Sequence, residues 1–178
     1  MYQTVLNFWF EEINQSQWWV KDAAFDQMII DRFSALHKSA MAGELFEWRK
    51  TAKGRLAEII VLDQFSRNMF RDTAKSFESD PLALALAQEA VSLKVDSSLT
   101  PIEKSFLYMP YMHSESLIIH KEAVGLYKRN GIESNYEFEI KHKEIIERFD
   151  RYPHRNKILN RVSTIEEIEF LKQPGSGF

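Results

Sequence analysis

The stretch from Leu56 to Arg71, LAEIIVLDQFSRNMFR, limits what the chain can fold into more than any other segment. On a helix, with about 100° between successive residues, apolar side chains cover nearly every face of this stretch, which predicts a buried helix. Asp63 and Arg67 fall in the same arc of that helix as Ile59. Because an unpaired buried charge costs several kcal/mol or more, both side chains must find partners inside the folded protein.

Two interpretations of the Asp63 and Arg67 pair are open. Residues four apart on a helix commonly form an ion pair that only braces the helix and contributes ~0.3–0.5 kcal/mol. Alternatively, the pair belongs to a polar site, since Gln64, Asn68 and Arg71 add further polar groups to the same helix. The sequence therefore locates a polar site without naming a reaction or a substrate.

The rest of the chain shows helical periodicity and no alternating strand pattern, which predicts an all-α fold. Asp80 is expected to cap a helix that has Pro81 in its first turn. Pro110 is expected to end or kink the helix that a Thr100–Glu103 capping box opens. The expected helical segments are residues 5–10, 22–42, 56–71, 80–94, 100–110, 114–129, 133–152 and 154–159, and a last one that a second capping box opens at residue 164.

One short segment occurs twice in the chain. Glu89–Leu93, EAVSL, recurs as Glu122–Leu126, EAVGL, 33 residues later, close to the 34-residue period of tetratricopeptide helix pairs. The 178 residues are enough for one domain that buries a sizeable core. We therefore predict a compact single domain over residues 1–178, a tetratricopeptide-like α-α superhelix of stacked helical hairpins.

Charge and composition exclude several classes of protein. The chain has 23 basic and 26 acidic residues and a net charge of −3, and neither sign forms a long block, so we expect no nucleic-acid partner. The absence of Cys excludes disulfides and thiolate metal sites and favours the cytoplasm. Acidic residues interrupt the N-terminal segment too early for a signal peptide, and no apolar run approaches the ~18 residues of a membrane span. P-loop, dinucleotide-binding and nucleophile-elbow motifs are missing.

Three segments combine polar functional groups with apolar anchors: residues 63–71, 109–115 and 142–156. Free backbone N–H groups at a helix start in the second segment would favour an anion, and arginines in the others could clamp a carboxylate or phosphate. An Arg-rich helix end can also simply satisfy its own last carbonyls. The expected ligand-binding residues are Arg67, Asn68, Arg71, His113, Ser114, Arg148, Arg151, Arg155 and Asn156. The expected catalytic residues are His142 or His154 as the acid–base group, with Glu115 or Asp63 orienting it.

The histidines have alternative interpretations. His142 lies in the apolar arc of its helix, so a core histidine and a functional one are equally open. The histidines and the glutamate of the second and third segments lack the tight spacing of metal motifs, so we expect no metal site, and no cofactor is indicated. His37 and His120 are expected to be ordinary helix-surface residues.

Five segments together resemble the DUF924 family of uncharacterised, mostly bacterial proteins: FWF, DQFSRN, MPYMHSE, HKEIIERFDRYPHRNKILNR and STIEEIEFL. The resemblance spans nearly the whole chain. It implies an all-helical, tetratricopeptide-like fold and no established activity. Family members usually carry Pro where this chain has Ser66, and Gly where it has Asp150 and Asn160.

We expect the three polar segments to converge on one pocket for a small anionic ligand, with hydrolase- or transferase-type chemistry. The alternative is a non-enzymatic, tetratricopeptide-like module that presents a groove to a peptide or protein partner. The two hypotheses differ in geometry. A small ligand needs one concave pocket, whereas a peptide needs an extended groove with an exposed apolar patch.

Overall fold

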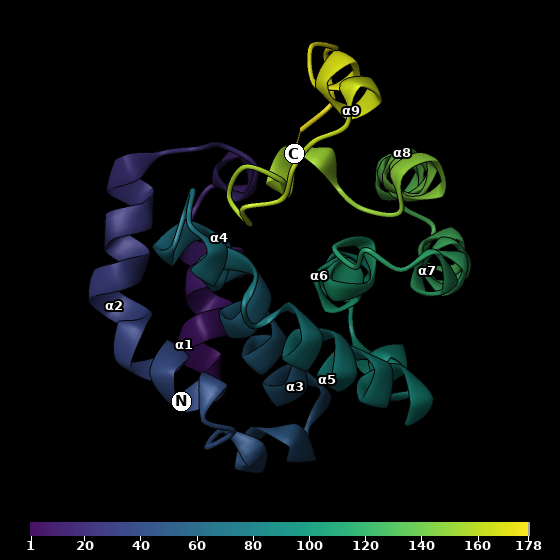
Figure 1. Ribbon diagram of the computed structural model, residues 1–178. Coiled ribbons are helices and arrows are strands. Elements are labelled where there is room, and N and C mark those ends of the chain that lie inside the picture. The colour runs from purple at the N-terminus through teal and green to yellow at the C-terminus, as the bar shows by residue number, and fades with distance from the viewer. Residues whose placement is uncertain (178) are drawn as a thin grey trace.

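The computed structural model describes residues 1–177, and these residues form helices joined by short turns, with no strand among them (Figure 1). The prediction of an all-α fold is confirmed. The α-helices are α1 (Tyr2–Asn7), α2 (Ala23–Met41), α3 (Ala52–Ile60), α4 (Ser66–Met69), α5 (Asp80–Ser92), α6 (Pro101–Met112), α7 (Leu117–Asn130), α8 (Glu133–Phe149) and α9 (Ile165–Phe170). Shorter helical turns are the π turns Phe8–Glu12 and Val61–Phe65 and the 3-10 turns Gln15–Trp18, Phe46–Lys50, Ala74–Phe77, Val95–Ser98 and Pro153–Arg155.

The stretch Leu56 to Arg71 lies at the centre of the molecule. It begins in α3, passes through the π turn Val61–Phe65 and continues as α4. Every residue from Leu56 to Ser66 is buried, so the prediction of burial is confirmed for this part of the stretch. Arg67, Asn68, Phe70 and Arg71 after it are partly exposed. The π turn was not predicted. Such turns widen one turn of a helix and occur often at functional sites.

The other helices surround this central segment. α1 packs on α3, α2 packs on α4 and the π turn, and α5 and α6 pack on α3 from another side. Aromatic rings fill the junction, because the ring of Phe65 lies 4.8 Å from that of Phe33 and 5.7 Å from that of Trp9, measured between centroids. α7 packs between α6 and α8, and Figure 1 shows these three helices in chain order on one side of the molecule. The more specific prediction of tetratricopeptide-like stacking stays a prediction.

The helix ends confirm most of the expected start and stop signals. Capping boxes open α6 at Thr100 and α9 at Thr164, as predicted. The expected cap at Asp80 is wrong, because Ser79 occupies the cap position and Asp80 is the first residue of α5. Its carboxylate binds arginine instead, as described below. α6 does not end at Pro110 but continues to Met112.

Two departures from the DUF924 pattern fall in left-handed backbone. Asp150 and Asn160, which stand where the family usually has Gly, both have a φ of 54°. Glycine adopts this region without strain, and Asn and Asp tolerate it better than most other residues. The substitutions therefore keep the turn after α8 and the turn before α9.

Crossing a membrane needs a long apolar helix, and no helix within residues 1–177 meets that requirement.

Candidate functional site

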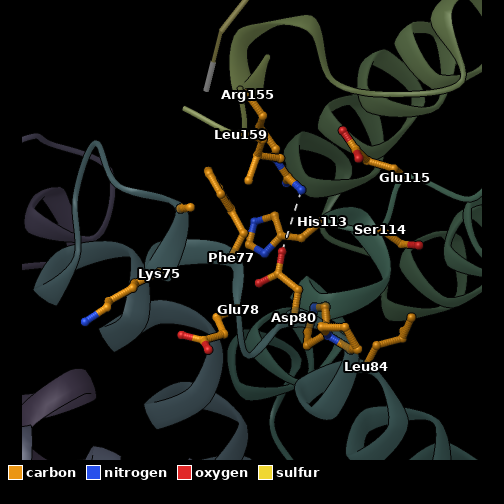
Figure 2. A pocket seen from close by; sticks show the side chains of 13 residues that line it. Lys75, Phe77, Glu78, Asp80, Leu84, His113, Ser114, Glu115, Arg155 and Leu159 are labelled. Carbon is orange, nitrogen blue, oxygen red and sulfur yellow. Dashed lines mark ion pairs between the residues drawn. The ribbon is translucent and has the colours of Figure 1, made fainter. Parts of the chain in front are cut away.

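A cavity of about 640 Å³ lies where three parts of the chain meet. These parts are the 3-10 turn Ala74–Phe77 with the start of α5, the end of α6 with the residues that follow it, and the 3-10 turn Pro153–Arg155 with Leu159 (Figure 2). The lining residues are Ala74, Lys75, Phe77, Glu78, Asp80, Pro81, Leu84, Pro110, His113, Ser114, Glu115, Arg155 and Leu159. Four predicted site residues thus share one cavity, namely His113, Ser114, Glu115 and Arg155.

Asp63 lies directly behind the cavity, in the π turn, with a side chain only 1% exposed. Its Oδ1 is 2.8 Å from Nη1 of Arg67 and 2.8 Å from Nδ1 of His113, while its Oδ2 accepts a hydrogen bond from the side chain of Gln64 at 2.6 Å. Burial alone would raise the pKa of Asp63. The charge of Arg67 and the contact with His113 outweigh burial and lower the pKa to about 2. Asp63 is therefore an ionised, fully occupied carboxylate.

Arg67 connects Asp63 to the cavity wall. It donates two parallel hydrogen bonds to the carboxylate of Asp80, at 2.9 and 3.0 Å, and one to the backbone carbonyl of Asp63 at 3.1 Å. This paired geometry is the strong arrangement for guanidinium and carboxylate. Arg67 is thus committed to protein carboxylates, and it holds Asp80 at the edge of the cavity.

His113 presents one ring nitrogen to Asp63 and the other to the cavity. Because the ionised Asp63 carboxylate can only accept, Nδ1 of His113 carries the proton in their 2.8 Å hydrogen bond. Burial, then the positive charge of Arg67, lower the pKa of His113, although Asp63 opposes them. The ring is therefore neutral at pH 7, and Nε2 is a hydrogen-bond acceptor. Within residues 1–177 no group donates to Nε2.

Arg155 is the most unusual group in the cavity wall. Its side chain is 7% exposed, yet no described residue accepts a hydrogen bond from its guanidinium, and its Nε is buried without a partner. The nearest carboxylate oxygen, on Asp80, is 3.6 Å from Nη1. The guanidinium lies between two aromatic rings, 4.6 Å from the centroid of Phe77 and 4.6 Å from that of Tyr152. Burial, and then repulsion by Arg67, lower the pKa of Arg155.

Glu115 lines the cavity but already has partners. Its carboxylate accepts two hydrogen bonds from Arg161, at 2.7 and 2.9 Å, and one from the backbone N–H of Tyr152 at 2.7 Å. Burial would raise the pKa of Glu115, but these donors lower it. Ser114, next to it, accepts a hydrogen bond from the N–H of Ser116. Both residues hold the chain around the end of α6.

His142 and His154 do not line the cavity. Each packs against the ring of Tyr152, with ring centroids 5.7 and 5.6 Å apart respectively. Nδ1 of His142 donates to the carbonyl of Phe138 at 2.7 Å. Burial lowers the pKa of both histidines to about 3, so both are neutral at pH 7. The expected orienting role of Asp63 is therefore directed to His113, not to His142 or His154.

The other predicted ligand-binding residues lie elsewhere. Arg71 and Asn68 both bind Asp26 of α2, with Arg71 Nε 2.5 Å and Asn68 Nδ2 2.8 Å from its carboxylate. Two more arginines hold α9 against the end of α8, because Arg148 pairs with Glu166 and Arg151 pairs with Glu167. Asn156 donates to Ser163. The structure does not bring these residues together with Arg155.

The expectation that His37 and His120 lie on helix surfaces is wrong. His37 is buried, and its Nε2 is 2.7 Å from Oγ of Ser66. His120 is fully buried between α7 and α8, with Nδ1 2.7 Å from a carboxylate oxygen of Glu139. Both positions face neighbouring helices that the sequence of one helix does not reveal. Within residues 1–177, no three His or acidic side chains are placed to hold a metal ion.

Sequence reasoning missed the two residues that shape the cavity beside Arg155. Asp80 was interpreted as a helix cap, although its place before Pro81 only fixes it in the first turn of α5. The helical pattern assigns no role to Phe77, but its ring covers the guanidinium of Arg155. A signal was available, because an aromatic residue followed closely by a carboxylate at a helix start can serve an arginine from elsewhere in the chain.

Comparisons with known proteins identify a family and no activity. The family model described as "Bacterial protein of unknown function (DUF924)" matches residues 5–175. Among solved structures, the chain is similar to a protein of unknown function, ATU0120, from Agrobacterium tumefaciens, with 37% identity over 96% of both chains and a TM-score of 0.91. No match was found among curated proteins. The matched range and this similarity show that the chain belongs to the DUF924 family, as its motifs predicted.

Proposed function

We propose that the cavity binds a small organic anion and that Arg155 is its anchor. The observation that carries this proposal is the state of the Arg155 guanidinium, which is almost completely buried in the cavity wall while no described residue accepts its hydrogen bonds. Buried polar groups nearly always have hydrogen-bond partners, and a charged group without one is costly. A ligand in the cavity would supply the missing acceptors.

A carboxylate or phosphate matches these donors best. A guanidinium offers two parallel N–H groups that fit two oxygens of such a group. The rings of Phe77 and Tyr152 hold the guanidinium plane in place, so little side-chain freedom is lost when the ligand binds. Figure 2 shows the side chain of Arg155 directed toward Asp80 and His113, in the middle of the lining residues.

The remaining wall favours an organic ligand over an inorganic ion. Phe77, Pro81, Leu84 and Leu159 give one part of the lining an apolar character. Ligand pockets of several hundred Å³ typically combine such walls with a few polar groups that fix the orientation. An anion with a short hydrocarbon part would use both features of this cavity.

Hydrogen bonding, not net charge, is the basis of this proposal. The two carboxylates Asp63 and Asp80 balance the two guanidinium groups Arg67 and Arg155, and His113 is neutral. A bound anion would add one negative charge to a balanced cluster. A neutral amide of the same shape is therefore the decisive comparison, because it offers one acceptor oxygen and no charge.

Butyrate and butyramide provide this comparison. We expect butyrate to bind the wild-type protein, measured by calorimetry and by a rise in melting temperature, and butyramide to bind at least tenfold more weakly. Binding to the native state stabilises it by about 2.7 kcal/mol at a hundred times Kd. Arg155→Met, which keeps an unbranched side chain between the two rings, should abolish the response.

Arg148→Met is the matched control, because Arg148 is an exposed arginine that does not line the cavity and pairs with Glu166. It should bind butyrate as the wild type does at the same ionic strength. Equal responses of the wild type and Arg155→Met would contradict the proposal. In that case Arg155 would be a structural cation, and the peptide-binding alternative would gain support.

A further inference from the structure

We propose that the ligand of this cavity carries a hydroxyl group as well as its anionic group, and that Nε2 of His113 accepts the hydrogen bond of that hydroxyl. The inference rests on the proposed function, since Arg155 would hold the anionic group. It adds a second recognition element and narrows the ligand class to small hydroxy acids.

The position of the His113 proton follows from the contacts of Asp63. Asp63 is buried, and it is held as a carboxylate by Arg67 at 2.8 Å. Its hydrogen bond to Nδ1 of His113 therefore requires a proton on that nitrogen. In a neutral ring the other nitrogen then carries a lone pair. Asp63 thus fixes His113 as an acceptor on the cavity side.

The surroundings of Nε2 contain no partner from the described chain. His113 lines the cavity, its side chain is 16% exposed, and no residue within 1–177 donates to Nε2. Figure 2 shows the His113 ring, the Arg155 guanidinium and the Asp80 carboxylate all directed into the space between the lining residues. The cavity therefore offers the N–H groups of Arg155 as donors without acceptors. It also offers Nε2 of His113 as an acceptor without a donor.

A hydroxy acid satisfies both walls at once. Its carboxylate takes the N–H groups of Arg155, and its O–H donates to Nε2 of His113. A simple carboxylate would leave the lone pair of Nε2 unused, while a protonated amine would place a third cation beside Arg155 and Arg67. The hydroxyl is the donor that adds no charge to the cluster.

Butyrate, 2-hydroxybutyrate and 3-hydroxybutyrate test the inference, because they differ only in the hydroxyl group and its position. One hydrogen bond should make at least one hydroxy acid bind roughly 2- to 10-fold more tightly than butyrate, measured as Kd by calorimetry at pH 7. If butyrate binds and neither hydroxy acid binds more tightly, this inference is wrong while the proposed function stands. If none of the three binds, both are wrong.

His113→Asn is the informative variant. The amide of asparagine can replace Nδ1–H as a donor to Asp63, but it has no atom at the position of Nε2. The variant should lose the preference for the hydroxy acid, so that its Kd values for butyrate and for the hydroxy acid become equal. A preference that persists in this variant would place the hydroxyl elsewhere and overturn the inference.

NMR spectroscopy of the wild-type protein tests the inference without relying on a variant that has to fold. The ¹⁵N chemical shifts of the His113 ring should show a protonated Nδ1 and an unprotonated Nε2 at pH 7. The preferred hydroxy acid should shift the Nε2 resonance, and butyrate should leave it nearly unchanged. A protonated Nε2 in the free protein would refute the assignment of His113 as an acceptor.

Discussion

Replacing Asp63 by Ala tests the central arrangement most directly. The carboxylate is buried, forms an ion pair with Arg67 and accepts hydrogen bonds from the side chains of His113 and Gln64. Removing one partner of a buried ion pair typically costs about 3–5 kcal/mol, because the other charge is left uncompensated. In Asp63→Ala, Arg67 would keep its two hydrogen bonds to Asp80, so its positive charge would still have a carboxylate partner. We therefore expect the free energy of unfolding to fall by about 3 kcal/mol, the lower end of this range.

The assay is chemical denaturation of the wild type and of Asp63→Ala at pH 7, with linear extrapolation to water. Glu147→Ala is the control, because Glu147 pairs with Lys143 four residues earlier on an exposed helix face. Its loss should be only ~0.3–0.5 kcal/mol. A loss of less than about 0.5 kcal/mol for Asp63→Ala would show that the pair braces a solvated helix, and it would refute the argument from burial.

The pH dependence provides an independent check on the same residue. The pKa of Asp63 falls from its ordinary 3.8 to about 2 in the folded protein. A lowered carboxyl pKa stabilises the folded state above the unfolded pKa, and that contribution disappears as pH falls through the folded pKa. The difference in unfolding free energy between the wild type and Asp63→Ala should therefore shrink by about 1.8 kcal/mol between pH 4 and pH 2. A constant difference over this range would contradict the contacts of Asp63.

Three further predictions concern stability, and each is checked by chemical denaturation. Gly54→Ala should cost about 2 kcal/mol or more, because an added Cβ would lie 2.1 Å from the backbone oxygen of Trp48, whereas Gly125→Ala in α7 should be neutral or stabilise by up to about 1 kcal/mol. Equal effects of the two substitutions on stability would contradict the close contact between Gly54 and the backbone of Trp48. Lys94→Gly should stabilise by roughly 0.5–1 kcal/mol, because Lys94 has a φ of 57°, and a loss of stability would show that its side chain contributes more than the strain. Burial lowers the pKa of His142 from 6.5 to about 3, so the unfolded chain takes up a proton first, and stability should fall as pH drops below 6.5. His142→Phe should flatten that slope by up to about 1.4 kcal/mol per pH unit, and an unchanged slope would assign the proton uptake to other groups.

Local patterns predicted the helices and the burial of Asp63, because helical periodicity and capping depend on neighbours within a few residues. Arg67, expected in the same buried arc, is partly exposed. The same patterns could not show which distant residue completes each contact. His113, which binds Asp63, lies 50 residues away along the chain. Nothing in the helical periodicity of either segment distinguishes this partner from the other histidines.

The sequence also could not show which arginine lines the cavity. Arg148 and Arg155 looked equivalent in the sequence, since both lie in one Arg-rich segment. Arg148 pairs with the exposed Glu166 of α9. Arg155 is buried between two aromatic rings, and no described residue accepts a hydrogen bond from its guanidinium. The difference depends on where α9 and Phe77 come to lie, which is a property of the packed fold. The Arg-rich segment therefore predicted more arginines in one site than the structure brings together.

The π turn Val61–Phe65 also affects how relatives of this chain should be aligned. A π turn accommodates about one more residue than a regular helical turn, so the residues after it are rotated by about 100° relative to an uninterrupted α-helix. Asp63 lies inside that turn, and Arg67 and Arg71 come after it. A relative that kept all three letters but lacked one residue in this segment would direct its arginines to a different side of the helix. Segment length, and not letter identity alone, thus decides which family members can build the Asp63–Arg67–Asp80 arrangement.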